Sequence, residues 1–224
     1  MERYFSASLI FAGLMALGSM AAQADPLFTN PGTHPLRYGD GFSLGSEFVV
    51  ETANLEVTAL GLYDTSGSGF FQSHDVGLWD VSAGNTEVAS ATVPAGTGAS
   101  LVNGFRYVNL ISSVSLVLGD QYILAAFYPV GETPGVNDQL LDHNGSGSNA
   151  ATDPNFGSFV AAFTSTGLGS SLGHLSEPNG TASGTDYVGP NLLYTTASPE
   201  PGTWLGMATG LIVIGAVLRR RHTS

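Results

Sequence analysis

One segment of the sequence has oxygen-bearing residues at the spacing of a calcium-binding loop. From Asp142 it reads DHNGSGSNAATD, with glycine at the sixth position and a carboxylate at the twelfth. Calcium takes about six to eight oxygen ligands, and loops of this kind supply them from alternate positions. The candidate ligands are Asp142, Asn144, Ser146, the carbonyl of Ser148, and Asp153. Because only two of these are carboxylates, we expect weak binding, with a Kd of about 10⁻⁴ to 10⁻³ M.

The same segment also fits a loop that holds no metal. The sequence indicates no flanking helices of the kind that hold an EF-hand loop, and Gly, Ser and Asn are the usual residues of turns and flexible loops. The whole stretch from Gly131 to Phe156 lacks a strand pattern, so we expect one long loop there. Between the two interpretations we favour the loop without metal.

Four aromatic residues could form a platform for a sugar ring. They are Trp79, Tyr63, Phe70 and Phe71. An aromatic platform binds a saccharide only if its ring faces are exposed, whereas a tryptophan in a short strand is more often part of the core. We favour core packing and keep carbohydrate binding as the alternative.

Motifs for catalysis are weak in this chain. Two segments, 41–45 and 169–173, fit the pattern Gly-x-Ser-x-Gly. A nucleophile elbow needs a strand before the serine and a helix after it, and neither segment is followed by a helical pattern. The histidines have no metal-binding spacing, and the chain contains no cysteine and no lysine. We therefore expect a protein that is not an enzyme and has no catalytic residues.

The charge is strongly acidic. The net charge is -12, and four of the six cations lie close to the two ends of the chain. Residues 25–198 hold only two arginines, Arg37 and Arg106, against sixteen acidic residues, which gives -14. Binding to nucleic acid requires a basic surface that neutralises phosphates, so the charge argues against a nucleic-acid partner.

The first 24 residues have the three parts of a secretory signal peptide. A short charged start precedes an apolar run over 5–21, and Ala22-Gln23-Ala24 follows. The small residues at Ala22 and Ala24 fit a signal peptidase cleavage site. We expect export, with the mature chain starting at Asp25.

The last 26 residues combine three features in a fixed order. Pro199-Glu200-Pro201 precedes an apolar run over 203–218, and an arginine cluster follows. The cluster is Arg219, Arg220 and Arg221. Sixteen helical residues span about 24 Å, so the run can just cross a membrane with the arginines in the cytoplasm.

These C-terminal features resemble the PEP-CTERM sorting signal of Gram-negative bacteria. The resemblance implies processing by an exosortase at the inner membrane, followed by release or attachment at the cell surface or in the extracellular matrix. It also implies an association with exopolysaccharide. The segment 199–224 is therefore expected to anchor the precursor before it is processed.

The middle, residues 25–198, is expected to be one all-β domain. Its apolar runs are short, rich in Val, Tyr, Phe and Thr, and separated by Gly, Ser, Asn and Asp, which is typical of strands. Strands are predicted at 47–51, 55–63, 75–81, 87–93, 105–110, 114–118, 121–128, 158–164 and 187–195. Their number and spacing predict a two-sheet antiparallel β-sandwich of jelly-roll type.

This middle region resembles a bacterial extracellular β-sandwich family of unassigned function. The resemblance rests on the strand and turn residues of 57–63, 73–80, 88–93, 105–108, 119–122 and 189–191. It implies a fold and a location and transfers no site residues. We expect a non-enzymatic protein of the cell surface or the exopolysaccharide matrix. The alternative is a carbohydrate-binding module, assisted by calcium, that associates with exopolysaccharide.

Overall fold

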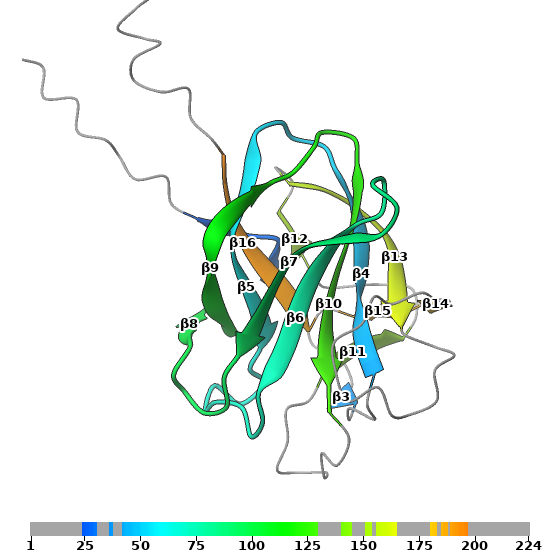
Figure 1. Cartoon of the computed structure of the whole chain (residues 1–224). Coiled ribbons are helices and arrows are strands. Elements are labelled where there is room, and N and C mark those ends of the chain that lie inside the picture. Colours follow the sequence, from blue (N-terminus) through cyan, green and yellow to red (C-terminus); the bar gives the residue numbers. More distant parts are fainter. Residues whose placement is uncertain are drawn as a thin grey trace, which may run out of the picture.

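The computed structural model describes the central part of the chain. The described residues are 24–30, 36–37, 42–129, 140–144, 151–153, 156–164, 180–182, 185–187 and 189–196. Within them every regular element is a β-strand (Figure 1), and none is a helix that could cross a membrane. Residues 1–23 of the predicted signal peptide and the whole sorting segment 199–224 lie outside the described residues.

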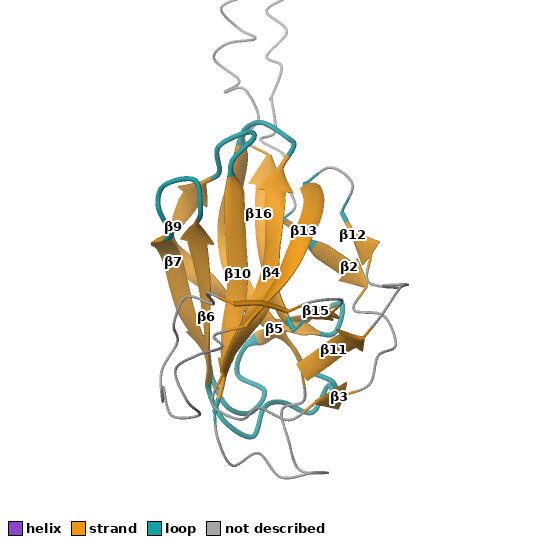
Figure 2. Cartoon of the chain, turned by 90° about the vertical axis from the view of Figure 1, so that its right-hand side faces the viewer, coloured by secondary structure: helices purple, strands orange, loops and turns teal. Residues whose placement is uncertain are grey.

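Two antiparallel sheets face each other and form a sandwich (Figures 1 and 2). The five-stranded sheet has the order β1 (Asp25–Pro26), β16 (Pro190–Thr196), β5 (Leu55–Tyr63), β9 (Phe105–Ser115) and β8 (Ser100–Val102). The six-stranded sheet has the order β14 (Gly180–Ala182), β13 (Gly157–Thr164), β4 (Phe42–Val50), β10 (Gln121–Tyr128), β6 (His74–Asp80) and β7 (Thr86–Val93). The predicted two-sheet antiparallel β-sandwich is thus confirmed.

Two smaller sheets complete the described residues (Figure 2). One pairs β15 (Thr185–Tyr187), β11 (Leu140–Asn144) and β3 (Leu36–Arg37), and the other pairs β12 (Ala151–Thr152) with β2 (Phe28–Asn30). The expectation of a strandless loop from Gly131 to Phe156 was therefore wrong, because β11 and β12 both lie in that stretch. Two-residue and five-residue strands are too short for their alternation to stand out from a background of Gly, Ser and Asn.

The core lies between the two large sheets. Alternate residues of β5 such as Leu55 and Val57 are fully buried, and Val76, Leu78 and Leu124 face them from the other sheet. Burying a side chain of this size contributes about 1.5 to 3 kcal/mol relative to leaving it in water. The period-2 pattern of the sequence therefore produces the sandwich by placing one row of each strand in the core.

A two-residue turn between β8 and β9 shows how the sequence sets the local pairing. Val102 pairs with Phe105, and the two residues between them, Asn103 and Gly104, have φ angles of 51° and 84°. A type I′ hairpin turn requires positive φ at both central residues, and Asn-Gly is the preferred pair for it. The turn fixes the register of β8 on the first three residues of β9.

Candidate functional site

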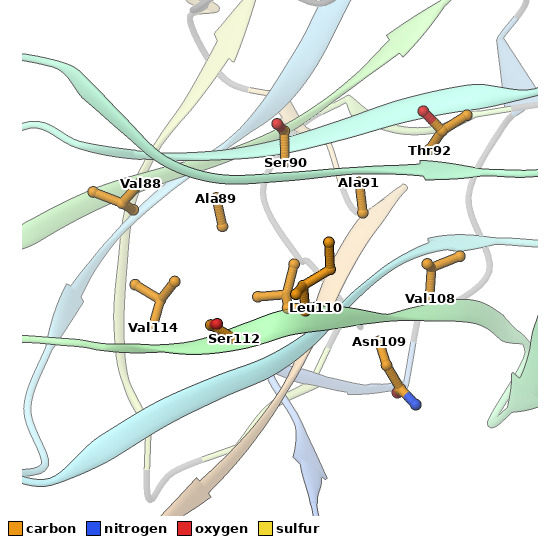
Figure 3. A pocket seen from close by; sticks show the side chains of 11 residues that line it. Val88, Ala89, Ser90, Ala91, Thr92, Val108, Asn109, Leu110, Ser112 and Val114 are labelled. Atoms are coloured by element: carbon orange, nitrogen blue, oxygen red, sulfur yellow. The ribbon is translucent and has the colours of Figure 1, made fainter.

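At the edge of the sandwich where β7 ends the six-stranded sheet, a groove lies between strands β7 and β9 (Figure 3). We call it the β7–β9 groove, and its volume is about 390 Å³. It is lined by Val88, Ala89, Ser90, Ala91, Thr92, Val108, Asn109, Leu110, Ile111, Ser112 and Val114. These side chains are aliphatic, hydroxyl or amide groups, so the lining has no acid or base to take part in proton transfer.

The groove exists because both strands are edges at this place. β7 is the last strand of the six-stranded sheet. β9 pairs with β5 on one side, but on its other side β8 covers only Phe105, Arg106 and Tyr107. Beyond Tyr107, the described residues place no strand against this side of β9. Backbone N–H and C=O groups on such edges are free to pair with an added strand.

Small residues on β7 leave the groove unfilled. Ala89 and Ala91 point toward β9, and Leu110 and Val114 point toward β7 from the opposite side (Figure 3). All four are partly buried and pack against the main core. Because alanine reaches less far than valine or leucine, the two edges face each other across an apolar hollow rather than a packed seam.

Both strands that line the groove have bulges. In β7 the register shifts at Val88, since Leu78 pairs with Ala89 while Trp79 pairs with Glu87. In β9 the shift is larger, because Val57 pairs with Val114 and Ala59 with Asn109. The four residues from Leu110 to Ser113 therefore stand opposite one residue of β5. Bulges gather at sheet edges and next to functional sites, where they redirect side chains.

The larger bulge presents an apolar side chain to solvent. Ile111 is fully exposed, with a relative exposure of 106%. The prediction of two strands here, 105–110 and 114–118, is wrong: β9 is one strand, Phe105–Ser115, with a bulge in it. The two adjoining serines, Ser112 and Ser113, were the available signal, because they interrupt an otherwise apolar run.

Three carboxylates accept hydrogen bonds from residues of β7 and β9 near the groove. Near Val88 and Val114 lie Glu87, which accepts a hydrogen bond from Ser90 at 2.8 Å, and Glu56, which accepts one from Ser113 at 3.1 Å. At the other end Asp75 accepts a hydrogen bond of 2.6 Å from Thr92. Glu87 is exposed, and Glu56 and Asp75 are half-buried. Ser90 and Thr92 point away from β9 (Figure 3), so Glu87 and Asp75 lie on the outer face of the six-stranded sheet, and the lining of the groove itself is uncharged.

A second constellation, the Arg106 clamp, is buried at one end of the sandwich. We define it as Arg106, Asp64 and the loop carbonyls that accept from the guanidinium. Arg106 donates from Nε to Asp64 Oδ2 at 2.7 Å, and its two terminal nitrogens donate to the carbonyls of Gly67, Thr97 and Ala99. These bonds tie the β5–β6 loop and the β7–β8 loop to β9. The clamp therefore holds the two loops together, because one guanidinium donates hydrogen bonds to backbone carbonyls of each loop.

The carboxylate of Asp64 is held in its charged form. It also accepts from the backbone N–H of Ser66, Gly67 and Gly69. Burial by itself would raise its pKa, but the hydrogen bonds from Arg106, Gly69 and Ser66, with the charge of Arg106, outweigh burial and lower the pKa below its ordinary value. A carboxylate bound by several N–H groups is stabilised as the anion in this way.

The four aromatic residues proposed as a sugar platform do not form one. Trp79 is 4% exposed and Phe70 is 5% exposed, and Tyr63 is half-buried with its ring 5.2 Å from that of Phe105. Only Phe71, at 65% exposed, presents its ring to solvent among the four. The core-packing interpretation is correct for Trp79 and Phe70, because each ring is enclosed by apolar neighbours.

Trp79 lies in a second, smaller cluster on the outer face of the six-stranded sheet. Ile123 of β10 pairs with Trp79 on one side and with Glu47 of β4 on the other. Trp79 packs with Ile123 and Ala125. Glu47 is 7% exposed, and its burial raises the pKa of the carboxyl group. Both faces of this sheet are therefore buried at β6, which is why alternation in the sequence could not decide the side of Trp79.

The predicted calcium ligands fall into three groups. Asp142 and Asn144 belong to strand β11 and pair with Tyr187 and Thr185 of β15. Ser146 and Ser148 lie outside the described residues. Asp153 is 8% exposed, and the pKa of the Tyr194 hydroxyl is raised first by the burial of Tyr194 and then by the neighbouring Asp153 carboxylate. Within the described residues no three acidic or histidine side chains are grouped to hold a metal, and the calcium site stays a prediction.

The remaining predicted positions add little to the site. Ser43, the serine of the first Gly-x-Ser-x-Gly segment, is fully buried within β4. A nucleophile elbow places the serine where a strand ends and a helix begins, whereas β4 continues from Ser43 to Val50. The second segment, 169–173, and the sorting residues 199–201 and 219–221 lie outside the described residues, as does Ala22, while Ala24 is the first residue of the described chain.

Comparisons with known proteins give only distant likenesses among solved structures. The sequence matches no family model and no curated protein. A similar solved structure contains the cysteine protease and lectin-like domains of Cwp84, a surface layer associated protein of Clostridium difficile. The two share 12% identity with a TM-score of 0.39, over 70% of this chain and 33% of that one. The chain thus spans about a third of that structure, and a likeness this distant assigns neither fold nor function.

Proposed function

We propose that this chain is an exported, non-enzymatic protein of the cell surface or the exopolysaccharide matrix. In this proposal signal peptidase removes residues 1–24, the helix 203–218 holds the precursor in the inner membrane, and an exosortase acts at Pro199-Glu200-Pro201. The β-sandwich is then the working part, and it acts by binding rather than by catalysis.

The observation that carries the binding role is the lining of the β7–β9 groove. Its residues offer apolar contact and hydrogen bonds but no titratable group. A hydrolase needs an acid, a base or a nucleophile within about 3 Å of the substrate. A concave, mostly apolar surface with a few polar groups is instead typical of a binding site. The charged Arg106 clamp supports the same view, because its arginine is engaged by loop carbonyls.

Cell fractionation tests the export and sorting route. The full chain should be recovered in processed form from the matrix or the cell surface of a producing cell that holds an exosortase. A Pro199→Ala/Glu200→Ala variant should accumulate as full-length precursor in the membrane fraction. A control variant, Pro94→Ala in the β7–β8 loop, should be processed normally. Normal release of the double variant would overturn the sorting assignment.

A turnover assay tests the non-enzymatic role. The released protein should show no hydrolysis of chromogenic glycosides or esters above a buffer blank. Turnover above the blank that follows the folded protein through purification would overturn this role and point to a catalytic site. The fractionation result would be unaffected.

A further inference from the structure

We propose that the sandwich of the membrane-anchored precursor lies end-on against the bilayer, with Val117 and Leu118 in contact with a lipid surface that has no net charge. The inference rests on the anchoring proposed above and adds which face of the domain turns toward the membrane. We call this face the exit end. It consists of the β4–β5 turn at 51–54, the β9–β10 turn at 116–120 and the end of β16 at Thr196 (Figure 1).

The chain enters and leaves the sandwich at the exit end. β1 and β16 are antiparallel, and Asp25 pairs with Tyr194, so the start of β1 lies beside the last residues of β16. Thr196 pairs with Leu55, the first residue of β5. Leu116, which directly follows β9, donates from its N–H to the carbonyl of Leu55 at 2.9 Å. The predicted signal peptide and the predicted sorting segment therefore both join the domain at the exit end, beside the β9–β10 turn.

The short connection to the apolar run keeps the exit end near the membrane. Six residues, 197–202, lie between the end of β16 and the run 203–218, and six residues span about 20 Å when fully extended. The nine residues of β5 correspond to about 30 Å along the sandwich at roughly 3.3 Å per residue, and the β5–β6 loop extends beyond them. The connection is therefore shorter than the domain is long. It cannot run back along the sandwich to turn the opposite end toward the bilayer.

The β9–β10 turn holds two apolar side chains outward at the exit end. Val117 and Leu118 are 54% and 56% exposed. The carbonyl of Val117 accepts a hydrogen bond from Asp120 at 3.2 Å, and Gly119, the third residue of the turn, has a φ of 88°. A positive φ at this position is typical of a type II turn. Gly119 also donates to the carbonyl of Val50 at 2.8 Å. The turn is thus fixed in advance, so contact with lipid requires little further ordering.

The position of this apolar pair makes lipid the favoured partner. Apolar side chains gain free energy on leaving water in proportion to the area they bury. In the precursor the run 203–218 holds the domain at the bilayer, so that even a weak contact acts at a high effective concentration. Val117 and Leu118 are on the end from which the chain continues into the membrane, and the bilayer is the nearest apolar phase to them.

Carboxylates beside the turn determine the kind of lipid. Asp25 and Glu51 are exposed and Asp120 is half-buried, and all three lie at the exit end. Arg106 is enclosed in the clamp at the opposite end. Anionic headgroups would repel the exit end, whereas a zwitterionic surface would not. We therefore infer a contact with zwitterionic lipid through the apolar pair.

Quenching by spin-labelled lipid measures which face meets the bilayer. Since the chain contains no cysteine, one introduced cysteine can carry a fluorophore on the full chain in phosphatidylcholine vesicles that contain headgroup-labelled lipid. Ala53→Cys marks the exit end, Ile111→Cys marks the side, and Phe71→Cys marks the opposite end, and all three positions are exposed. Because the two ends are about 30 Å apart, quenching at position 53 should be at least about threefold stronger than at either other position.

A pair of double variants decides whether the apolar side chains make the contact. Val117→Ser/Leu118→Ser should lower quenching at position 53 at least about twofold, since binding strength follows the buried apolar area. Leu101→Ser/Val102→Ser is the matched control, because it removes an exposed leucine and an exposed valine from β8 at the opposite end, and it should leave quenching unchanged. Adding phosphatidylglycerol to the vesicles should lower quenching at position 53, and salt should restore it. Thermal melting checks that each variant is folded.

Three outcomes would overturn the proposal. They are equal quenching at positions 53 and 71, equal quenching at positions 53 and 111, and unchanged quenching at position 53 in the Val117→Ser/Leu118→Ser variant. Stronger quenching with phosphatidylglycerol than without it would overturn the choice of an uncharged surface.

Flotation of the vesicles separates these failures from a failure of the proposed anchoring. A chain that floats with the vesicles but is quenched equally at the labelled positions is anchored and lacks the end-on contact. A chain that does not float with them overturns the anchoring, and the end-on contact with it.

Discussion

The Nε atom of Arg106 lies 2.7 Å from Oδ2 of Asp64, and both side chains are almost completely buried. Arg106 belongs to β9, and Asp64 directly follows β5, the strand that pairs with β9. The pair therefore joins two strands of one sheet to the loops that leave them. Arg106 is thus a buried cation, with a buried counter-ion, in a domain that is strongly acidic.

Removing the arginine of this pair should be strongly destabilising. An Arg106→Met variant keeps much of the apolar volume but leaves Asp64 as a buried charge without its counter-ion. Breaking a buried ion pair from one side costs about 3 to 5 kcal/mol, and urea unfolding monitored by Trp79 fluorescence measures it. The control is Arg37→Met, which changes the other arginine of the domain. A loss below about 1 kcal/mol for Arg106→Met would show that the clamp is not a stabilising element.

Acid should weaken the clamp in a defined direction. The pKa of Asp64 is lower in the folded chain than its ordinary value of 3.8. A carboxyl group whose pKa is depressed by folding stabilises the fold at pH values above its unfolded pKa, and that contribution is lost as the pH falls through the folded pKa. The urea concentration at the midpoint of wild-type unfolding should therefore decrease as the pH is lowered below about 4. The Asp64→Asn variant should be less stable at pH 7 and should show a smaller fall over the same range.

The buried carboxyl group of Glu47 should act in the opposite direction. Burial raises its pKa above 4.5 in the folded chain, so its charged form is disfavoured there and opposes folding at neutral pH. Glu47→Gln should raise the free energy of unfolding at pH 7. The gain should shrink as the pH falls and should vanish below the unfolded pKa, where both states are protonated. Glu51→Gln is the matched control: Glu51 is exposed just after β4, and glutamine keeps an oxygen that can accept the hydrogen bond from Ser158, so its effect on the free energy of unfolding at pH 7 should be small.

Trp79 should matter for stability rather than for sugar binding. Its side chain fills the small cluster with Ile123 and Ala125, so Trp79→Ala leaves a cavity and should cost about 3 to 5 kcal/mol. Phe71→Ala removes an exposed ring and should change stability by no more than about 0.5 kcal/mol. Affinity electrophoresis in exopolysaccharide gels extends the test. If the wild type is retarded and the folded Phe71→Ala variant is not, the result would support a carbohydrate site at Phe71.

The longer strands could be predicted closely from the sequence. The ranges 55–63 and 121–128 agree with β5 and β10 at both ends, because each combines a period-2 pattern with turn residues directly outside it. The strands that were missed, such as β1, β2 and β8, have only two or three residues. A period of two cannot be read from so few positions, and these strands form because a neighbouring edge is available to pair with them.

The groove could not be predicted, because its causes are not local. Ala89 and Ala91 look like ordinary strand residues until β9 is placed opposite them. The bulge from Leu110 to Ser113 is defined only by its register against β5, and the sequence of β9 alone does not show which residues lack partners. Arg106 was visible as one of two cations in the domain, but its role depends on carbonyl groups of two loops that are distant in the chain.

The position of β16 has a consequence for the timing of folding. β16 lies inside its sheet, between β1 and β5, although it is the last of the described strands in the chain. Contacts between segments so far apart in sequence form late, after the intervening chain is present. Under the proposed export route, the sheet stays open until residue 196 has crossed, and only six residues separate that point from the apolar run 203–218. Under this route, the domain can close at nearly the same time as the apolar run 203–218 enters the membrane. A precursor that is ready for processing is therefore one whose domain has only just become able to fold.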